Sequence, residues 1–261
     1  EQRAGGCLHS HCFGGALDDF WLELGAHSSF NSYGNLLVIL ERIQLLDRLQ
    51  RRAKVGLRLF AEGAIRSIPS QLYFSELLLA PFRLIGVKKT GRSVADYFGP
   101  IVGRRNYAAV FEPAFSAVIC QPADNFPADV LFRSRLRRKD IPRGFTLPGG
   151  LQTIADNLSQ QPGIMVELGQ TAREIWRTGK HFTVYTDGSE YTARALCLAT
   201  PVAVVAELLQ AEFPNLADLL ARIQTAMTET VGVAVHAEAL RLPPLAGLIG
   251  RNEVFYSAVS R

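Results

Sequence analysis

Cysteine is scarce in this sequence of 261 residues. The four cysteines are Cys7, Cys12, Cys120 and Cys197, which are too few and too scattered for the disulfide framework that stabilises small secreted domains. Because such frameworks form in oxidising compartments, their absence favours a reducing one. We therefore expect a cytoplasmic protein.

The sequence also lacks any run of about 18 uninterrupted apolar residues, which excludes a conventional membrane-spanning helix. Segment 72–85 is apolar but interrupted by Glu76 and Arg83, so it fits either a helix at a membrane surface or an ordinary core helix. Peripheral contact with the inner face of a membrane therefore stays open. No signal-peptide pattern follows Glu1, which is not a Met, and we expect the natural chain to begin farther upstream.

Several compact functional motifs are missing as well. There is no Gly-x-Ser-x-Gly elbow, which disfavours a serine hydrolase of the α/β type, and no phosphate-binding P-loop. The Gly-x-Gly-x-x-Gly turn of dinucleotide-binding folds is also absent. Aromatic residues lie near Arg104 and Arg105, but no recognition motif accompanies them, so we expect no nucleic-acid partner.

The cysteine and histidine side chains do not form a standard metal motif. Cys7, His9, His11 and Cys12 are close in sequence, and alternate residues of a strand share one face. A structural zinc site needs four ligands, however, and no second cluster is present to complete one. We predict no metal site.

Charge is distributed unevenly along the chain. The totals are 28 Lys and Arg against 24 Asp and Glu, but residues 42–143 contain 19 basic and 8 acidic residues, a difference of +11. The remainder therefore has 9 basic and 16 acidic residues, a difference of −7. A basic middle region favours an anionic partner such as a carboxylate substrate or an anionic membrane surface. A solvated basic surface is the alternative.

The first part of the chain predicts hairpins and helices. Alternating apolar residues predict two strand pairs, and apolar spacing predicts a long amphipathic helix followed by several short helices separated by Gly and Pro. The expected strands are 5–13 with 20–24 and 57–60 with 64–68, the long helix is 35–52, and the short helices occupy 70–125.

The last third has the pattern of an α/β domain. A helix is expected at 151–159, after the glycines Gly149 and Gly150. Strands are then expected at 164–168, 172–176, 182–185, 193–199 and 231–238. Further helices are predicted at 201–210, where Pro201 suits a first helical turn, and at 216–227.

Several short segments occur in one order along the chain. They are Arg3-Ala4-Gly5-Gly6, Glu23-Leu24-Gly25, the Pro148-Gly149-Gly150 turn with its helix, the strand pair around Ala172, and Leu198-Ala199-Thr200-Pro201. In this order they resemble the flavin-dependent amine oxidase superfamily, and within it most the protoporphyrinogen oxidases. Segments 63–69, 93–98 and 111–118 are similar to that family too.

The resemblance implies an α/β fold with a partial Rossmann-like FAD-binding domain, an inserted α+β substrate domain and a helical subdomain. The family's Gly-rich phosphate turn and its C-terminal flavin segment are expected outside this sequence. The implied division is 1–50 FAD-binding domain, 51–69 substrate-domain strands, 70–128 helical and possible membrane-facing subdomain, 129–158 substrate domain and connection, 159–212 FAD-binding domain, and 213–261 substrate domain.

The cofactor that the resemblance implies is FAD. Arg3, Gly5 and Gly6 would contact its adenosine-diphosphate part, and Gly25 and Ala26 would lie near the isoalloxazine. Ala172 would place its backbone at the adenine, and Thr200 and Pro201 would border the cofactor cleft.

Three positions depart from the family pattern. Cys7 stands where the family usually has Arg after the glycine pair, and Glu1 is closer to Arg3 than the family's ribose-binding acid. In the family, an arginine ahead of segment 63–69 pairs with a substrate propionate. Arg58 is displaced from that position by one residue, which on a strand reverses the face.

The implied activity is an FAD-dependent oxidation, in which a hydride passes from a substrate carbon to the flavin and oxygen or another acceptor reoxidises it. A porphyrinogen is the implied substrate, and an amine, a polyamine or a carotenoid precursor is the alternative. A second hypothesis is a non-catalytic fragment or membrane-surface binding module, and the chain as given is expected to be inactive alone. No catalytic base is identified.

Overall fold

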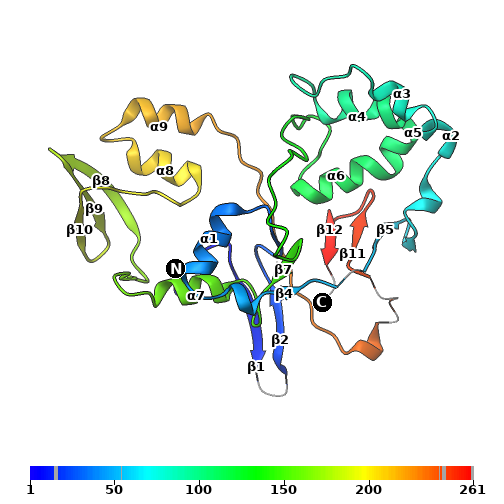
Figure 1. Ribbon diagram of the computed structural model, residues 1–261. Helices are drawn as coiled ribbons and strands as arrows, with labels where there is room; N and C mark the ends of the chain where they lie inside the picture. Colours follow the sequence, from blue (N-terminus) through cyan, green and yellow to red (C-terminus); the bar gives the residue numbers. More distant parts are fainter. Residues whose placement is uncertain (15–16, 54, 241, 243–244, 260–261) are drawn as a thin grey trace. The chain divides into compact units, whose positions relative to one another are not determined.

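The computed structural model describes residues 1–14, 17–53, 55–240, 242 and 245–259, which form two compact units (Figure 1). The first unit comprises Glu1–Ala26, Arg42–Leu45 and Gly149–Met227. The second comprises His27–Glu41, Leu46–Pro148 and Thr228–Arg261. Each unit is thus built from three separate stretches of chain, and the six-part division expected from the sequence stays a prediction.

The first unit begins with the predicted N-terminal hairpin. Strands β1 (Ser10–Gly14) and β2 (Leu17–Glu23) pair antiparallel, with Ser10 opposite Glu23. Backbone hydrogen bonds extend this ladder toward the chain start, from Leu24 N to His9 O at 2.7 Å and from Ala26 N to Cys7 O at 2.7 Å. The predicted helix after the glycine pair is also confirmed, as α7 (Gln152–Ser159).

The rest of the first unit is an antiparallel meander with two helices. Strand β9 (His181–Thr186) lies between β8 (Ala172–Thr178) and β10 (Glu190–Ala193). Helices α8 (Val202–Leu209) and α9 (Pro214–Ala221) share one small core with this sheet. Its buried members are Ile175, Leu208, Leu209 and Ala217.

Three predicted strands of the last third are wrong. Residues 164–168 and 231–238 form no strand. Of the predicted strand 193–199, only Ala193 lies in a strand, as the last residue of β10. An alternating sequence becomes a strand only where a neighbouring strand completes its hydrogen bonds, and no such neighbour exists among the described residues. Among the described residues, the one pair of parallel strands is β5 with β11, and both strands belong to the second unit. The mixed α/β character is therefore confirmed, but the expected Rossmann-like sheet is not formed there.

The second unit contains a four-stranded sheet in the order β12, β11, β5, β6. Its strands are β5 (Leu57–Ala61), β6 (Ala64–Arg66), β11 (Gly247–Gly250) and β12 (Ser257–Val259). Strands β5 and β6 form the second predicted hairpin, whose turn residues Glu62 and Gly63 have φ of 56° and 71°. Helix α6 (Glu112–Ile119) packs its Ala114 and Ala117 on this sheet.

A second, smaller sheet and one helix lie at the start of the second unit. Strand β7 (Gly144–Thr146) pairs on either side with β3 (Ser29–Phe30) and β4 (Gln50–Arg51). Helix α1 (Gly34–Arg42) is much shorter than the predicted helix 35–52. Gln44 has a positive φ of 57°, which ends the helical path, and a 3₁₀ turn, Leu46–Arg48, and strand β4 follow.

The predicted series of short helices forms the helical block of the second unit. Its elements are α2 (Phe74–Leu77), α3 (Ala80–Leu84), α4 (Val94–Val102), α5 (Arg104–Asn106), a π-helical turn (Tyr107–Phe111) and α6. Short 3₁₀ turns, Pro69–Gln71 and Ala237–Ala239, also occur in this unit. Across the described residues, every helix falls short of the length and apolar character needed to cross a bilayer.

Candidate cofactor-binding site

The hairpin of the first unit caps the amino end of α7. Ser10 Oγ donates to Glu23 Oε2 at 2.5 Å, and the two side chains then accept hydrogen bonds from the helix start. Leu151 N donates to Glu23 Oε1 and Gln152 N to Ser10 Oγ, both at 3.0 Å. The first backbone amides of a helix have no hydrogen-bond acceptor within the helix. The side chains of Glu23 and Ser10 supply acceptors for the amides of Leu151 and Gln152, and so hold α7 in position.

Gly150 explains why glycines precede this helix. It has φ of 90°, and a Cβ there would overlap the side chains of Ser10 and Trp21. Only glycine combines this backbone conformation with such close packing. The glycine pair therefore brings α7 against the hairpin.

Gln152 of α7 holds the loop formed by residues 3–8. Its Nε2 donates to Ala4 O at 2.7 Å, and its Oε1 accepts from Arg3 Nη1 at 2.9 Å. Sequence reasoning missed Gln152, since no local pattern distinguishes it from other polar residues in the first turn of a helix. Only the tertiary contacts of Gln152 with Arg3 and Ala4 reveal its role.

Arg3 directs its guanidinium into the same loop. Nη1 donates to Leu8 O at 2.9 Å and Nη2 to Gly6 O at 2.6 Å, besides the bond to Gln152. These bonds make Arg3 a brace that fixes the path of residues 4–8. A direct contact between Arg3 and FAD stays a prediction. The guanidinium would make that contact through N–H groups that do not take part in these hydrogen bonds.

Gly5 and Gly6 form the turn that Arg3 braces. Gly5 has φ of 114°, and a Cβ on it would lie 2.9 Å from both Ala155 Cβ and Leu8 O. Gly6 has φ of 52°, and the space around its own Cβ position is open. The backbone amides of Gly5, Gly6 and Cys7 donate to no atom of the described residues. Consecutive amides in such a turn can bind an anion.

Gly25 and Ala26 lie directly beside this turn. Ala26 N donates to Cys7 O at 2.7 Å, and a Cβ on Gly25 would overlap that same carbonyl. The structure therefore brings together four residues expected at the cofactor, namely Gly5, Gly6, Gly25 and Ala26. Cys7 lies between the two pairs and is exposed.

The other expected cofactor residues lie around the meander core. Gly169 N donates to Glu1 O at 2.9 Å, which attaches the segment leading into β8 to the start of the chain. Ala172, the first residue of β8, is half-buried against the core of the meander. Thr200 and Pro201 are exposed where α8 begins, and Leu198 just before them packs in the same core.

Arg58 lies in the second unit, on β5. Leu59 and Ala61 of the same strand are 0% and 1% exposed beneath α6. Because side chains alternate along a strand, Arg58 points to the opposite face, as does Phe60. Arg58 is half-exposed there beside Leu248 of β11. Its role in substrate binding stays a prediction.

Two of the cysteines and histidines near the chain start, His11 and Cys12, make local contacts. His11 stacks edge-on against Phe13 with ring centroids 4.8 Å apart, and Cys12 Sγ lies 3.8 Å from Gly149 O. Across the described residues, no group of three or more His, Cys, Asp or Glu side chains is arranged to hold a metal ion.

Comparison with solved structures identifies the fold. A provisionally named protoporphyrinogen oxidase of Exiguobacterium sp. 255-15 matches with a TM-score of 0.57 and 16% identity, over 77% of this chain and 53% of its own. The fatty acid isomerase of P. acnes that produces CLA gives 0.58 and 17%, over 79% and 52%. Cyclohexylamine oxidase of Brevibacterium oxydans IH-35A gives 0.53 and 13%, over 84% and 55%. This chain thus spans about half the length of the structures it matches.

Comparison of the sequence with known proteins and families gives a consistent result. No curated protein matches the chain. The family model described as flavin-containing amine oxidoreductase matches residues 1–239. This match spans nearly the whole sequence and includes every residue expected at the cofactor. The chain therefore belongs to the flavin-containing amine oxidoreductase family.

Proposed function

We propose that this chain is part of an FAD-dependent oxidoreductase of the amine oxidase and protoporphyrinogen oxidase type, and that residues 5–7 bind the diphosphate of FAD. The observation that carries the proposal is the turn at Gly5 and Gly6. Its three amides donate to none of the described residues, and open space surrounds Gly6. An anionic diphosphate would complete these hydrogen bonds.

The surrounding residues fit such a group. The turn is held from one side by Arg3 and Gln152 and from the other by the backbone of Gly25 and Ala26. A turn fixed in advance loses little conformational freedom when it binds, which favours affinity. Ala172, Thr200 and Pro201 would contact the adenine side and the cleft border, as the family resemblance implies.

Bound FAD would supply a two-electron acceptor for a hydride from a substrate carbon, with later reoxidation by oxygen or another acceptor. The residues of this chain would contribute binding and orientation. Arg3 and Gln152 keep the turn in place, and the Ser10 and Glu23 pair keeps α7 against the hairpin.

The substrate that we propose is an anionic porphyrinogen, which would place the protein in porphyrin biosynthesis. Arg58 supports an anionic ligand, because it lies on the face of its sheet opposite α6, beside Phe60 and Leu248. An aromatic and aliphatic surface with one cation suits an apolar ring that carries carboxylates. An amine, a polyamine or a carotenoid precursor remains the alternative within the family.

The cofactor proposal is tested by FAD binding to the chain itself. Bound FAD is measured from the visible flavin spectrum and from quenching of flavin fluorescence. The informative variant is Gly6→Glu, which places a carboxylate at the proposed diphosphate site and should weaken binding by about tenfold or more. The matched control is Gly163→Glu, since Gly163 also has a positive φ, 80°, and no atom near its Cβ position.

The outcomes separate the two functional hypotheses. Stoichiometric FAD on the wild-type chain, lost in Gly6→Glu and kept in Gly163→Glu, would support the site. FAD retained equally by both variants would show that residues 5–7 do not bind it. A wild-type chain that binds no FAD would favour the non-catalytic fragment.

For the substrate, a longer protein that contains this chain is mixed anaerobically with protoporphyrinogen and, separately, with a polyamine. Bleaching of the flavin band by protoporphyrinogen alone would support the porphyrinogen, and Arg58→Leu should then raise KM. Bleaching by the polyamine alone would overturn that assignment.

A further inference from the structure

The meander β8 to β10 has two faces, and they differ in what covers them. Ile175 of β8 is 1% exposed and belongs to the core that this sheet shares with α8 and α9. Because side chains alternate along a strand, Glu174 and Trp176, on either side of Ile175, point away from those helices. We call this side the outer face of the meander. Glu174 and Trp176 are both exposed, so the outer face is open to water.

The strand register places carboxylates and an aromatic ring side by side on the outer face. Tyr185 of β9 lies directly opposite Glu174 of β8 and Glu190 of β10. Neighbouring strands are about 4.8 Å apart, so the backbones of the two glutamates lie about 10 Å apart with Tyr185 between them. Trp176 is the next residue of β8 on this face, and its Nε1 donates to Glu174 Oε2 at 3.0 Å. This hydrogen bond holds the carboxylate beside the indole and leaves its other oxygen for a further partner.

The same side chains border a shallow hollow in the sheet surface. Glu174, Trp176, Thr178 and Tyr185 line this space of about 470 Å³. Its two rings are accessible, since Trp176 is 42% and Tyr185 39% exposed. The faces of Trp and Tyr rings attract cations, and a carboxylate at the edge of the ring adds to that attraction. The hollow therefore has the composition of a site for an organic cation.

The charges on the outer face are negative and unbalanced. From Glu174 to Thr178 of β8, and at the positions opposite them on β9 and β10, this face carries two glutamates and no Lys or Arg. Arg173, just ahead of Glu174, is already paired with Asp187 at 2.6 Å. Within the described part of the chain, Glu174 and Glu190 form no ion pair. Two carboxylates without a countercharge favour a cationic partner.

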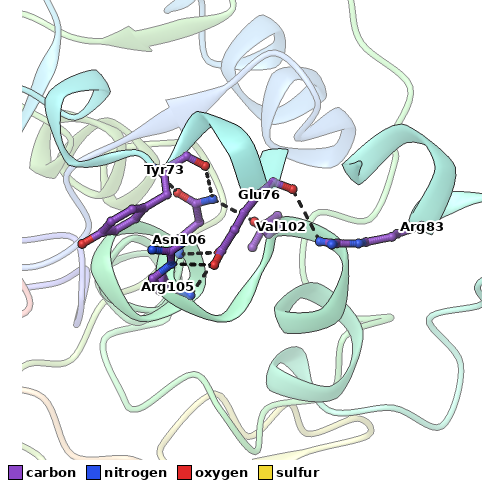
Figure 2. Close-up of polar contacts among 6 residues, drawn as sticks. All are labelled: Tyr73, Glu76, Arg83, Val102, Arg105 and Asn106. Carbon is purple, nitrogen blue, oxygen red and sulfur yellow. Dashed lines mark hydrogen bonds and ion pairs between the residues drawn. The ribbon is translucent and has the colours of Figure 1, made fainter. Parts of the chain in front are cut away.

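The helical block of the second unit shows the same two kinds of group holding an arginine (Figure 2). Arg105 Nε donates to Glu76 Oε1 at 2.7 Å, and the guanidinium lies 4.5 Å from the centre of the Tyr73 ring. Tyr73 is itself fixed by the fully buried Asn106, whose Nδ2 donates to Tyr73 O at 3.0 Å and whose Oδ1 accepts from Tyr73 N at 2.7 Å. A carboxylate beside an aromatic ring thus positions a guanidinium in this protein. Glu174 beside Trp176 repeats that pair of groups without the arginine.

We propose that the outer face of the meander binds an extended, arginine-bearing segment of a partner protein. One guanidinium pairs with Glu174 and stacks on Trp176, and a second pairs with Glu190 beside Tyr185. Arginines at alternate positions of an extended segment are about 7 Å apart on one side, and their long side chains span the remaining distance to the glutamates. A small polyamine is a poorer occupant, because an ammonium group lacks the planar surface that stacks on a ring. The contact is independent of FAD.

The experiment measures binding of a fluorescein-labelled peptide to the full chain by fluorescence anisotropy. The probe is Gly-Arg-Gly-Arg-Gly, and the matched peptide has citrulline in place of both arginines, which keeps their shape and removes their charge. We expect the arginine peptide to bind, and to bind less tightly as salt is added. The citrulline peptide should bind about tenfold more weakly or less, since both ion pairs are lost. A lysine peptide should bind about two- to fivefold more weakly than the arginine peptide, because it loses the stacking.

Substitutions on the two faces of the sheet locate the site. Glu174→Arg with Glu190→Arg should weaken binding of the arginine peptide by about tenfold or more, because two attractions become repulsions. Trp176→Ala should weaken it by about two- to fivefold. The matched control is Glu207→Arg with Asp218→Arg, which makes the same change of charge at exposed residues of α8 and α9, the helices on the other face. Circular dichroism checks that each variant is folded.

A second measurement needs no charge reversal and remains informative if those variants do not fold. The chain has two tryptophans, Trp21 and Trp176, whose indole N–H signals in an NMR spectrum are assigned with Trp176→Phe. The arginine peptide should shift the signal of Trp176 and leave that of Trp21 in place. The proposal is overturned if the arginine peptide does not bind, if the citrulline peptide binds equally, or if the Glu174 and Glu190 reversals act no more strongly than the control. It is also overturned if spermidine displaces the peptide at equal concentration, or if the chain self-associates and those reversals abolish the association.

Discussion

Gln152 and Arg3, 149 positions apart in sequence, are joined by a 2.9 Å hydrogen bond between Oε1 and Nη1. The same amide donates to Ala4 O at 2.7 Å. One side chain of α7 therefore holds both the arginine and the backbone of the turn that it braces. We regard this pair as the structural basis of the proposed cofactor site.

The first prediction concerns Gln152. Gln152→Ala removes the partner of Arg3 and of Ala4, and should lower the free energy of unfolding by about 1 kcal/mol. It should also weaken FAD binding, because the turn loses one of its two supports. Urea denaturation and flavin fluorescence measure the two effects. Gln160→Ala, at an exposed residue after the same helix, serves as the control and should change neither.

The second prediction concerns Gly150. Gly150→Ala forces a Cβ against Ser10 and Trp21 at φ of 90°, and should destabilise the protein by about 2 kcal/mol or more. Gly188→Ala is the control, because its surroundings are open. Thermal unfolding of both variants compares them, and equal melting temperatures would refute the packing argument.

The third prediction concerns Asn106 in the helical block. Asn106→Ala leaves the backbone groups of Tyr73 and Val102 without this partner in a buried site, which should lower stability by about 2 to 3 kcal/mol. Asn125→Ala replaces an exposed asparagine and should change it by less than about 0.5 kcal/mol. A similar effect of both substitutions, measured by urea midpoints, would contradict this role.

The fourth prediction concerns pH. The hydrogen bond from Arg105, together with the amide of Asn106, lowers the pKa of Glu76 below its ordinary value. A carboxyl with a lowered pKa in the folded state stabilises fully above its unfolded pKa, about 4.3, and loses this contribution as pH falls through the folded value. Glu76→Gln should therefore be less stable than wild type at pH 7, with a difference that shrinks in acid.

Urea midpoints measured from neutral to acidic pH check the Glu76 prediction. Glu207→Gln, at an exposed residue of α8, is the control and should track wild type throughout. A difference between Glu76→Gln and wild type that stays constant down to the lowest pH would show that the lost stability does not come from ionisation.

Local sequence patterns predicted the elements that form between residues close together in the sequence. The hairpins β1 with β2 and β5 with β6, the helix α7 and the strand pair β8 with β9 all follow from alternation, helical spacing and turn residues. The predicted helix 35–52 was wrong because Gln44 adopts a left-handed backbone, which its residue type does not signal.

Features that depend on residues far apart in the sequence were harder to predict from local patterns. Segments 164–168 and 231–238 were predicted as strands, yet form none among the described residues, because pairing depends on a neighbour that no local pattern specifies. For the cofactor site, the glycines suggested a close approach of backbone, and in the structure Ala26 N donates to Cys7 O, next to Gly5 and Gly6. The cofactor contacts themselves stay a prediction. Gln152, Ser10 and Glu23 were missed.

The similar structures include an oxidase, an isomerase and an amine oxidase, so the fold alone does not decide the reaction. The sequence by itself determined the local elements and the family, because turn residues, periodicity and segment order are written along the chain. Only the tertiary structure decided that Gln152 meets Arg3 and that Phe74, Leu78 and Phe82 remain in water. Both depend on which distant residues come together, since burial and long-range hydrogen bonds are properties of the packed chain.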